Sequence, residues 1–393
     1  MNKPVLFKSF YIWLALYYIV VFLSLDMYLP ALPAISSELG LTHDMAQYTI
    51  TLWFLGSASF QLILGPLSDY YGRKKVFILG VMVFVLSSLV IASSPSYTYI
   101  LTARFFQGAT VCSTMVAGSS TIHSVFSGRR AVQVLAVLSS ITILAPSLGP
   151  LLGAYIVKYY SWRCVFFILA LLGTVGLFVH AVIMPDTKDE NADLNVKLIF
   201  SAYADILMNK QFVLFVLANS LLISVFFMWI VESPFVIIKS LNLGELYFGY
   251  VQMPIFGAFI LGGQITRYFA GKYNISKIVS FGMSLGLLGA VFFMVFSWLE
   301  FNILYCVAAM SLMGVGASMT FGPLSRYAIL ASDGPIGSKV ALTSTATSLF
   351  GVIASFIVTM VNNMSFFNIA VPILVAMLLV NIMFFIADVP DID

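Results

Sequence analysis

The chain repeats one pattern from end to end: an apolar run long enough to cross a bilayer, then a short polar or Gly/Pro-rich break. A helix needs about 20 apolar residues to span the hydrocarbon core. Hydrophobic residues make up 61% of the 393 positions and charged residues only 9%, against about 25% charged residues in soluble domains. A soluble domain of this size could not shield so much apolar surface from water. The sequence therefore predicts an all-α polytopic membrane protein.

Twelve apolar runs can be delimited, six on each side of a polar stretch. The first is too long for the apolar core of a cleavable signal peptide and lacks a small-residue cleavage site, which indicates a first spanning helix. We therefore predict twelve transmembrane helices in two six-helix pseudo-repeats, residues 1–184 and 212–393, joined by a cytoplasmic linker, 185–211. The runs lie at 9–29, 47–67, 76–93, 98–121, 133–157, 162–184, 212–237, 247–268, 276–297, 301–325, 339–361 and 366–387.

The distribution of basic residues predicts the orientation. If the N-terminus is cytoplasmic, only Lys158, Arg163 and Lys239 of the 19 Lys and Arg residues fall in outer segments, and Arg104 falls within a helix. All the others lie in cytoplasmic segments, as the positive-inside rule requires. Both termini are therefore expected in the cytoplasm.

The two halves resemble each other. An acid precedes a proline late in the first helix of each half, Asp26 in one and Glu232 in the other. The loop after the second helix is basic in both, at 72–75 and at 271–272. Two parallel repeats of this kind are typical of secondary transporters that rock two bundles about a central substrate.

The break between the second and third helices reads Gly-Pro-Leu-Ser-Asp-Tyr-Tyr-Gly-Arg-Lys-Lys from 65 to 75. Gly65 and Gly72 permit a tight turn and close helix approach, and Asp69 can face a helix N-terminus or a basic partner. We interpret Gly65, Asp69, Gly72 and Arg73 as a conformational switch. The alternative, that the basic residues only anchor the loop on the cytoplasmic side, does not explain Asp69 or the glycine spacing.

Arg104 lies inside the fourth apolar run, where a charge costs at least ~2.5–3.5 kcal/mol and requires a partner or a wet cavity. At 1.5 Å per residue, Arg104 lies roughly 9 Å below the outer end of its helix, and Asp26 about 5 Å short of the outer end of the first. These depths agree, so we predict that Asp26 and Arg104 form a pair. A purely structural ion pair is the alternative.

The fifth run carries small residues on a helical spacing. Gly149, Pro150 and Gly153 lie in register with alanines at 136, 145 and 154. Such a face permits close helix contact, and we assign Gly149, Pro150 and Gly153 to the conformational switch.

Three of these stretches together resemble a known family. Residues 65–75 resemble motif A of the major facilitator superfamily, and Arg104-Phe-Phe-Gln-Gly108 resembles its motif B. The fifth run is similar to motif C of its drug/proton antiporters, with alanine for glycine at 136, 145 and 154. With the stretches at 229–234, 252–258 and 331–333, the resemblance to the MdfA-like and Bcr/CflA group extends over 14–344.

The resemblance implies the major facilitator fold and a proton-driven exporter of lipophilic drugs in the bacterial inner membrane, acting without a cofactor. It assigns proton coupling to Asp26, with Arg104. Tyr18 stands where relatives carry a second acid, and Glu232 where they carry glutamine. The expected substrate-binding residues are Tyr18, Asp26, Met27, Gln107, Phe226, Trp229 and Glu232.

Several alternatives stay open or are excluded. Glu232, roughly 30 Å along its helix, could simply be solvated at the outer surface, and the aromatic residues could serve packing alone. Transport could instead concern a specific metabolite or a metal chelate, in either direction. A net charge of +3 forms no basic patch for nucleic acid, and no phosphate-binding loop indicates ATP. No acid/histidine cluster indicates an enzyme or a metal site, and we expect a monomer.

Overall fold

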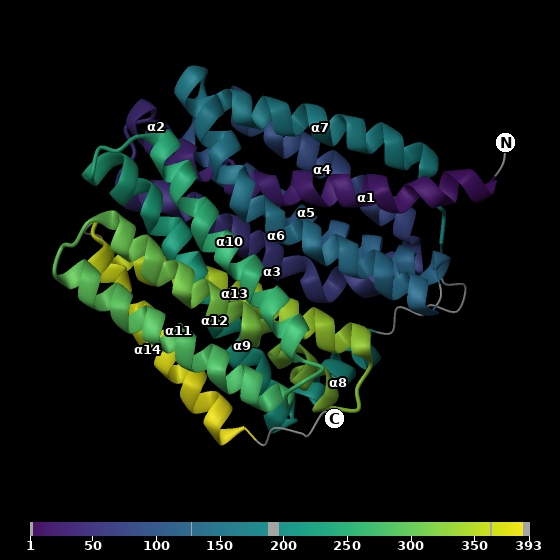
Figure 1. Ribbon diagram of the computed structural model, residues 1–393. Helices are drawn as coiled ribbons and strands as arrows, with labels where there is room; N and C mark the ends of the chain where they lie inside the picture. Colours follow the sequence, from purple (N-terminus) through teal and green to yellow (C-terminus); the bar gives the residue numbers. More distant parts are fainter. Residues whose placement is uncertain (1–2, 127, 188–195, 362–363, 388–393) are drawn as a thin grey trace. The chain divides into compact units, whose positions relative to one another are not determined.

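The computed structural model describes residues 3–126, 128–187, 196–361 and 364–387, and every element in these ranges is a helix. Within them, twelve helices have 21 residues or more, which confirms the predicted number (Figure 1). They are α1 (Lys3–Asp26), α3 (His43–Tyr71), α4 (Arg73–Ser93), α5 (Tyr97–Val125), α6 (Gly128–Tyr159), α7 (Trp162–Ile183), α9 (Lys210–Pro234), α10 (Glu245–Phe269), α11 (Ile275–Trp298), α12 (Ile303–Leu330), α13 (Ile336–Val361) and α14 (Phe366–Ile386).

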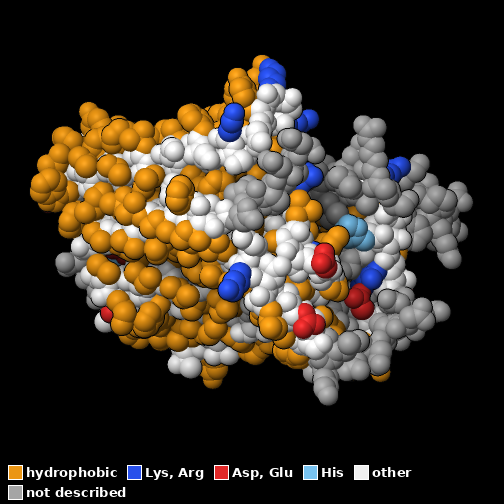
Figure 2. All heavy atoms as spheres, turned by 90° about the horizontal axis from the view of Figure 1, so that it is seen from below, with side chains coloured by type: hydrophobic (Ala, Val, Ile, Leu, Met, Phe, Trp, Pro, Cys, Tyr) orange, Lys and Arg blue, Asp and Glu red, His pale blue; other side chains and the backbone are white. Residues whose placement is uncertain are grey.

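Ten of these helices are long and apolar enough to cross a membrane, and α5 and α6 are the other two long helices of the described chain. Large apolar side chains lie on their outer surfaces, as Phe178, Val182 and Phe385 do. On the face shown in Figure 2, apolar side chains cover a broad area and charged side chains are few. So large an apolar surface is unfavourable in water but stable in contact with lipid chains. The chain is a multi-pass membrane protein.

The chain divides into two compact units, residues 1–199 and 200–393. In the first, α5 packs on α3 and α4, α7 packs on α4 and α1, and α1 also packs on α6 (Figure 1). In the second, α12 packs on α10 and α11, α14 packs on α11 and α9, and α9 also packs on α13. Each pair in one unit has its counterpart in the other when the six long helices are matched in order. The units are therefore structural repeats.

The first helix differs from its prediction. The apolar run 9–29 was expected to form one unbroken helix, but α1 ends at Asp26. A 3-10 turn, η1 (Leu29–Ala31), and the short α2 (Leu32–Glu38) continue the chain. Pro30 and Pro33 fall near the start of these elements and supply no backbone N–H, which prevents α1 from continuing.

The region between the units is partly helical. Of the predicted linker, 185–211, residues 188–195 lie outside the described residues. After them comes α8 (Val196–Leu207), and Asn209 caps α9 by accepting a hydrogen bond from the Phe212 N–H. A π-helical turn, η2 (Phe235–Ser240), extends α9 beyond Pro234, and α10 follows it.

Candidate functional site

The end of α1 frees a backbone carbonyl. The Met27 N–H still donates to the Leu23 oxygen at α-helical spacing, 2.9 Å, but the Tyr28 N–H donates to Leu25, three residues back, at 3.2 Å. In a continuing α-helix that N–H would bond the Ser24 oxygen. The Ser24 oxygen instead accepts a hydrogen bond from Arg104 Nη1, 2.9 Å away.

Arg104 is fully buried and ties three helices together. Its Nη1 also donates to Gln107 Oε1 at 2.7 Å, and Gln107 Nε2 donates to the Ser88 hydroxyl of α4 at 2.9 Å. The guanidinium carbon lies 4.2 Å from the centre of the Tyr28 ring, a cation–π contact. Arg104 Nε and Nη2 have no hydrogen-bond partner among the described residues, so part of this charge stays available to a ligand, a water or a carboxylate.

Asp26 is buried, with 3% of its surface exposed, two residues beyond the carbonyl that Arg104 binds. The predicted agreement in depth is therefore present, but the described residues include no ion pair between the two side chains. Instead of the expected ion pair with Asp26, Arg104 binds the Ser24 oxygen, because the helix break leaves this oxygen without its helical partner.

The small residues of α6 lie directly against the helix break. A Cβ atom at Gly149 would lie 2.6 Å from Asp26 Cβ, and one at Gly153 would lie 2.2 Å from the Met27 oxygen. Both distances are far below van der Waals contact, so α6 approaches α1 this closely only with glycine. Pro150 is buried within α6, and the side chain at position 136 lies outside the described residues.

A second cluster fixes the turn between α3 and α4. Arg73 Nε donates to Asp69 Oδ1 at 3.0 Å, and Nη1 donates to the Ser120 carbonyl of α5 at 3.1 Å and to the Ser124 hydroxyl. Gly72 has φ +103°, a conformation that L side chains rarely adopt. We call Asp69, Gly72 and Arg73 the latch.

Gly65 does not belong to this latch. It was expected to permit the turn or a close helix approach, but it lies inside α3. A Cβ atom there would make an ordinary contact, 3.8 Å from Val116. The expectation was wrong because the helix runs on for six residues before the turn.

The predicted residues of the second unit lie in its interior. Trp229 Nε1 donates to Gln252 Oε1 at 2.9 Å, and the indole stacks on Phe366 with centroids 5.1 Å apart. Phe226 contacts Phe256 and Phe259. Glu232 has 3% of its surface exposed. A solvated Glu232 was the alternative interpretation, and its burial rules this out.

Some members of the site were not expected from sequence. Tyr28, Ser24 and Ser88 complete the Arg104 network. Of these, only Tyr28 lies between the acid and the proline, Asp26 and Pro30, at the end of the first apolar run. Tyr18 was expected to contact substrate. Its hydroxyl donates to the Met115 oxygen of α5 at 3.3 Å, and its ring lies against Gly118.

Two six-helix repeats, each with a buried acid in its first long helix, are the architecture typical of secondary membrane transporters. The Major Facilitator Superfamily model matches residues 14–359, and the chain belongs to this superfamily. The solved structure of a bacterial homologue of the human lysosomal transporter Spinster shares the fold, with a TM-score of 0.73 at 13% identity, covering 98% of this chain and 96% of that one.

Curated relatives are closer in sequence. The chloramphenicol resistance protein CraA of Acinetobacter baumannii is 31% identical over 346 residues, 86% of this chain and 83% of the relative. The multidrug transporter MdfA of Yersinia pestis is 28% identical over 86% of this chain and 84% of its own. The multidrug resistance protein MdtM of Escherichia coli is 27% identical over 84% and 80%.

Proposed function

We propose that this protein is a proton-driven exporter of lipophilic drugs in the bacterial inner membrane, monomeric, with both termini in the cytoplasm and no cofactor. The relatives named for chloramphenicol or multidrug resistance support the substrate class. The observation that carries the mechanism is the buried carboxyl of Asp26 at the α1 break, two residues beyond the carbonyl that Arg104 binds.

The chemistry follows from the cost of burying charge. A neutral carboxylic acid is tolerated where Asp26 lies, whereas a carboxylate there needs a cation or several hydrogen bonds. The unpartnered Nε and Nη2 of Arg104, or a cationic substrate, could supply them. One carboxyl that binds a proton or its partner, but not both, couples two opposite fluxes during alternating access.

The side chains expected to bind substrate in each unit suit apolar ligands. In the first unit, Tyr18 of α1 contributes an aromatic ring and Met27, just after α1, a thioether; in the second, Phe226 and Trp229 of α9 contribute rings. Aromatic and methionine side chains adapt to ligands of varied shape. We assign Gln107 a positioning role, because both ends of its amide hold the Arg104 network.

Transport in liposomes tests the proposal. Wild type should concentrate a lipophilic drug when a pH gradient is imposed, and Asp26→Asn should allow exchange but no accumulation. Asp205→Asn, at an exposed position of α8, is the matched control and should behave as wild type. If Asp26→Asn still concentrates drug, the coupling acid lies elsewhere, and Glu232 becomes the first candidate. Uptake assays in inverted vesicles separate export from import.

A further inference from the structure

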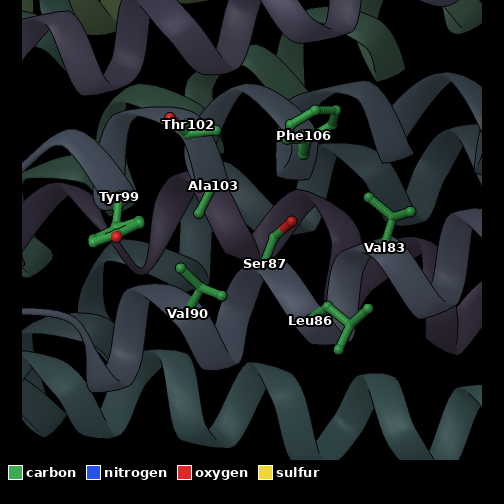
Figure 3. Close-up of a pocket in the computed structure, with 8 residues that line it drawn as sticks. All are labelled: Val83, Leu86, Ser87, Val90, Tyr99, Thr102, Ala103 and Phe106. Atoms are coloured by element: carbon green, nitrogen blue, oxygen red, sulfur yellow. The ribbon is translucent and has the colours of Figure 1, made fainter.

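An apolar groove of about 360 Å³ runs between α4 and α5 on the surface of the first unit (Figure 3). One wall comes from α4 and the other from α5, and Ser87 and Ala103 lie between them. The transport mechanism proposed above uses none of the wall residues. They are Val83, Leu86 and Val90 on α4, and Tyr99, Thr102 and Phe106 on α5.

The groove opens to the bilayer and not to water. Leu86 is 62% exposed and Phe106 45% exposed, on helices of a membrane-spanning bundle. The Thr102 hydroxyl donates to the Thr98 oxygen of its own helix, 3.0 Å away, so it presents no free donor. Apart from the hydroxyls of Ser87 and Tyr99, the rest of the lining is apolar, which favours an apolar ligand.

The position of the groove along the helices defines the ligand further. Tyr99 is close to the start of α5 at Tyr97, the depth at which tyrosines mark the membrane–water interface. From Tyr99 to Phe106 the groove extends roughly 10 Å along α5. This distance fits within the half-thickness of about 15 Å that one leaflet contributes to the hydrocarbon core.

We propose that this groove binds one acyl chain of a glycerophospholipid from the leaflet that contacts the N-terminal end of α5. The headgroup then lies beside Tyr99, and the chain runs between the α4 and α5 walls toward Val83. In the orientation proposed above this is the outer leaflet.

The groove is adjacent to the Arg104 network. Ser87 and Ala103 are chain neighbours of Ser88 and Arg104, and the Gln107–Ser88 hydrogen bond joins the same two helices. An acyl chain fills the space between α4 and α5 that would otherwise be a packing defect. The bound lipid therefore stabilises the helix pair that carries this network.

The proposal is tested with a phosphatidylcholine that carries a diazirine on its acyl chain, reconstituted with the full chain in phosphatidylcholine/phosphatidylethanolamine vesicles. After illumination, cross-linked peptides are mapped by mass spectrometry. Cross-links should be enriched on the α4 and α5 groove peptides of wild type, and be lost from them in Val90→Trp and in Thr102→Trp, which fill the groove from opposite walls. Val175→Trp, on the lipid-facing side of α7 with a similar exposure, 45% against 41% for Val90, should leave them unchanged.

Uniform labelling of all exposed helices in wild type would overturn the proposal, as would groove labelling that survives both tryptophan variants. Displacement of the label by a lipophilic drug at its transport concentration would assign the groove to substrate and overturn it as well. None of these outcomes depends on proton coupling, so the proposed function stands or fails separately.

Discussion

The two units share their helix neighbours but differ at the end of their first long helix. In the first unit α1 stops at Asp26, and the freed Ser24 carbonyl binds Arg104. In the second, α9 passes Glu232 and continues through Pro234 into a π-helical turn. The same helix packing therefore accommodates two different ends of the first long helix. In the first unit the helix break supplies the carbonyl that binds the buried cation, two residues before the acid.

The two units also differ in the interactions at the turn that follows their second long helix. The α3–α4 turn is held by the Asp69–Arg73 ion pair, whereas Lys272 of the α10–α11 turn lies over the Tyr268 ring, 3.8 Å from its centre. The second unit places its buried cation at another turn. Lys339 of α13 donates to the Ile329 and Ser332 carbonyls at the end of α12, at 2.7 and 2.6 Å. Only the first unit joins a carboxylate to its cation at such a turn among the described residues, so we assign switching to that turn.

Removing the carboxylate of the latch should have the largest effect. Asp69→Asn breaks the ion pair that holds Arg73 on α5, and we expect loss of turnover with drug affinity within a few fold of wild type. Transport in liposomes and binding in detergent measure the two quantities. Lys272→Gln, at the corresponding turn of the second unit, should leave both nearly unchanged. An equally large loss of binding in Asp69→Asn would contradict a switching role.

Glycine-to-alanine substitutions compare the close α1–α6 contact of the first unit with an open position in the second unit. Gly153→Ala places Cβ on the Met27 carbonyl and should lower stability by about 1–3 kcal/mol or more. Gly257→Ala has no heavy atom within 4 Å of the new Cβ and should be neutral or stabilising by up to ~1 kcal/mol, because alanine favours helix. Thermal unfolding in detergent compares them, and equal destabilisation would mean that the α1–α6 contact is not the cause.

The lysine of the second unit should contribute stability and not switching. Lys339→Met removes the charge-assisted bonds to the Ile329 carbonyl of α12 and to the Ser332 carbonyl just after it, and should cost about 1–3 kcal/mol. Lys277→Met, at an exposed position of α11, should cost almost nothing. Turnover at a temperature where both variants are folded should match wild type. If it falls as in Asp69→Asn, the second unit carries a switch too.

The sequence predicts the helices well because each apolar run had to satisfy its backbone inside the membrane. It also located Arg104 and Gly72, where a buried charge or a positive φ leaves little choice of residue. It missed the Ser24 carbonyl, since a backbone group has no signature in the residue type. It also missed the role of Lys339, because a capping lysine near a helix end looks like any positive-inside residue. The prediction for Gly65 was wrong because the spacing of residues in a motif does not show where a helix ends, and α3 continues to Tyr71.

The last comparison concerns the two acids. Asp26 and Glu232 are equally buried, each in the first long helix of its unit. Glu232→Gln keeps the side-chain shape and removes the charge. If Glu232 lines the substrate path, a lipophilic cation should bind more weakly by about 1 kcal/mol, roughly fivefold in Kd, and a neutral drug of similar size should change less. Unlike Asp26→Asn, the variant should still accumulate drug under a pH gradient, since coupling is assigned to the first unit.

Binding of the matched cationic and neutral ligands, measured by tryptophan fluorescence, decides between the roles. Equal weakening of both would make Glu232 a packing residue of α9, and loss of accumulation would move coupling into the second unit.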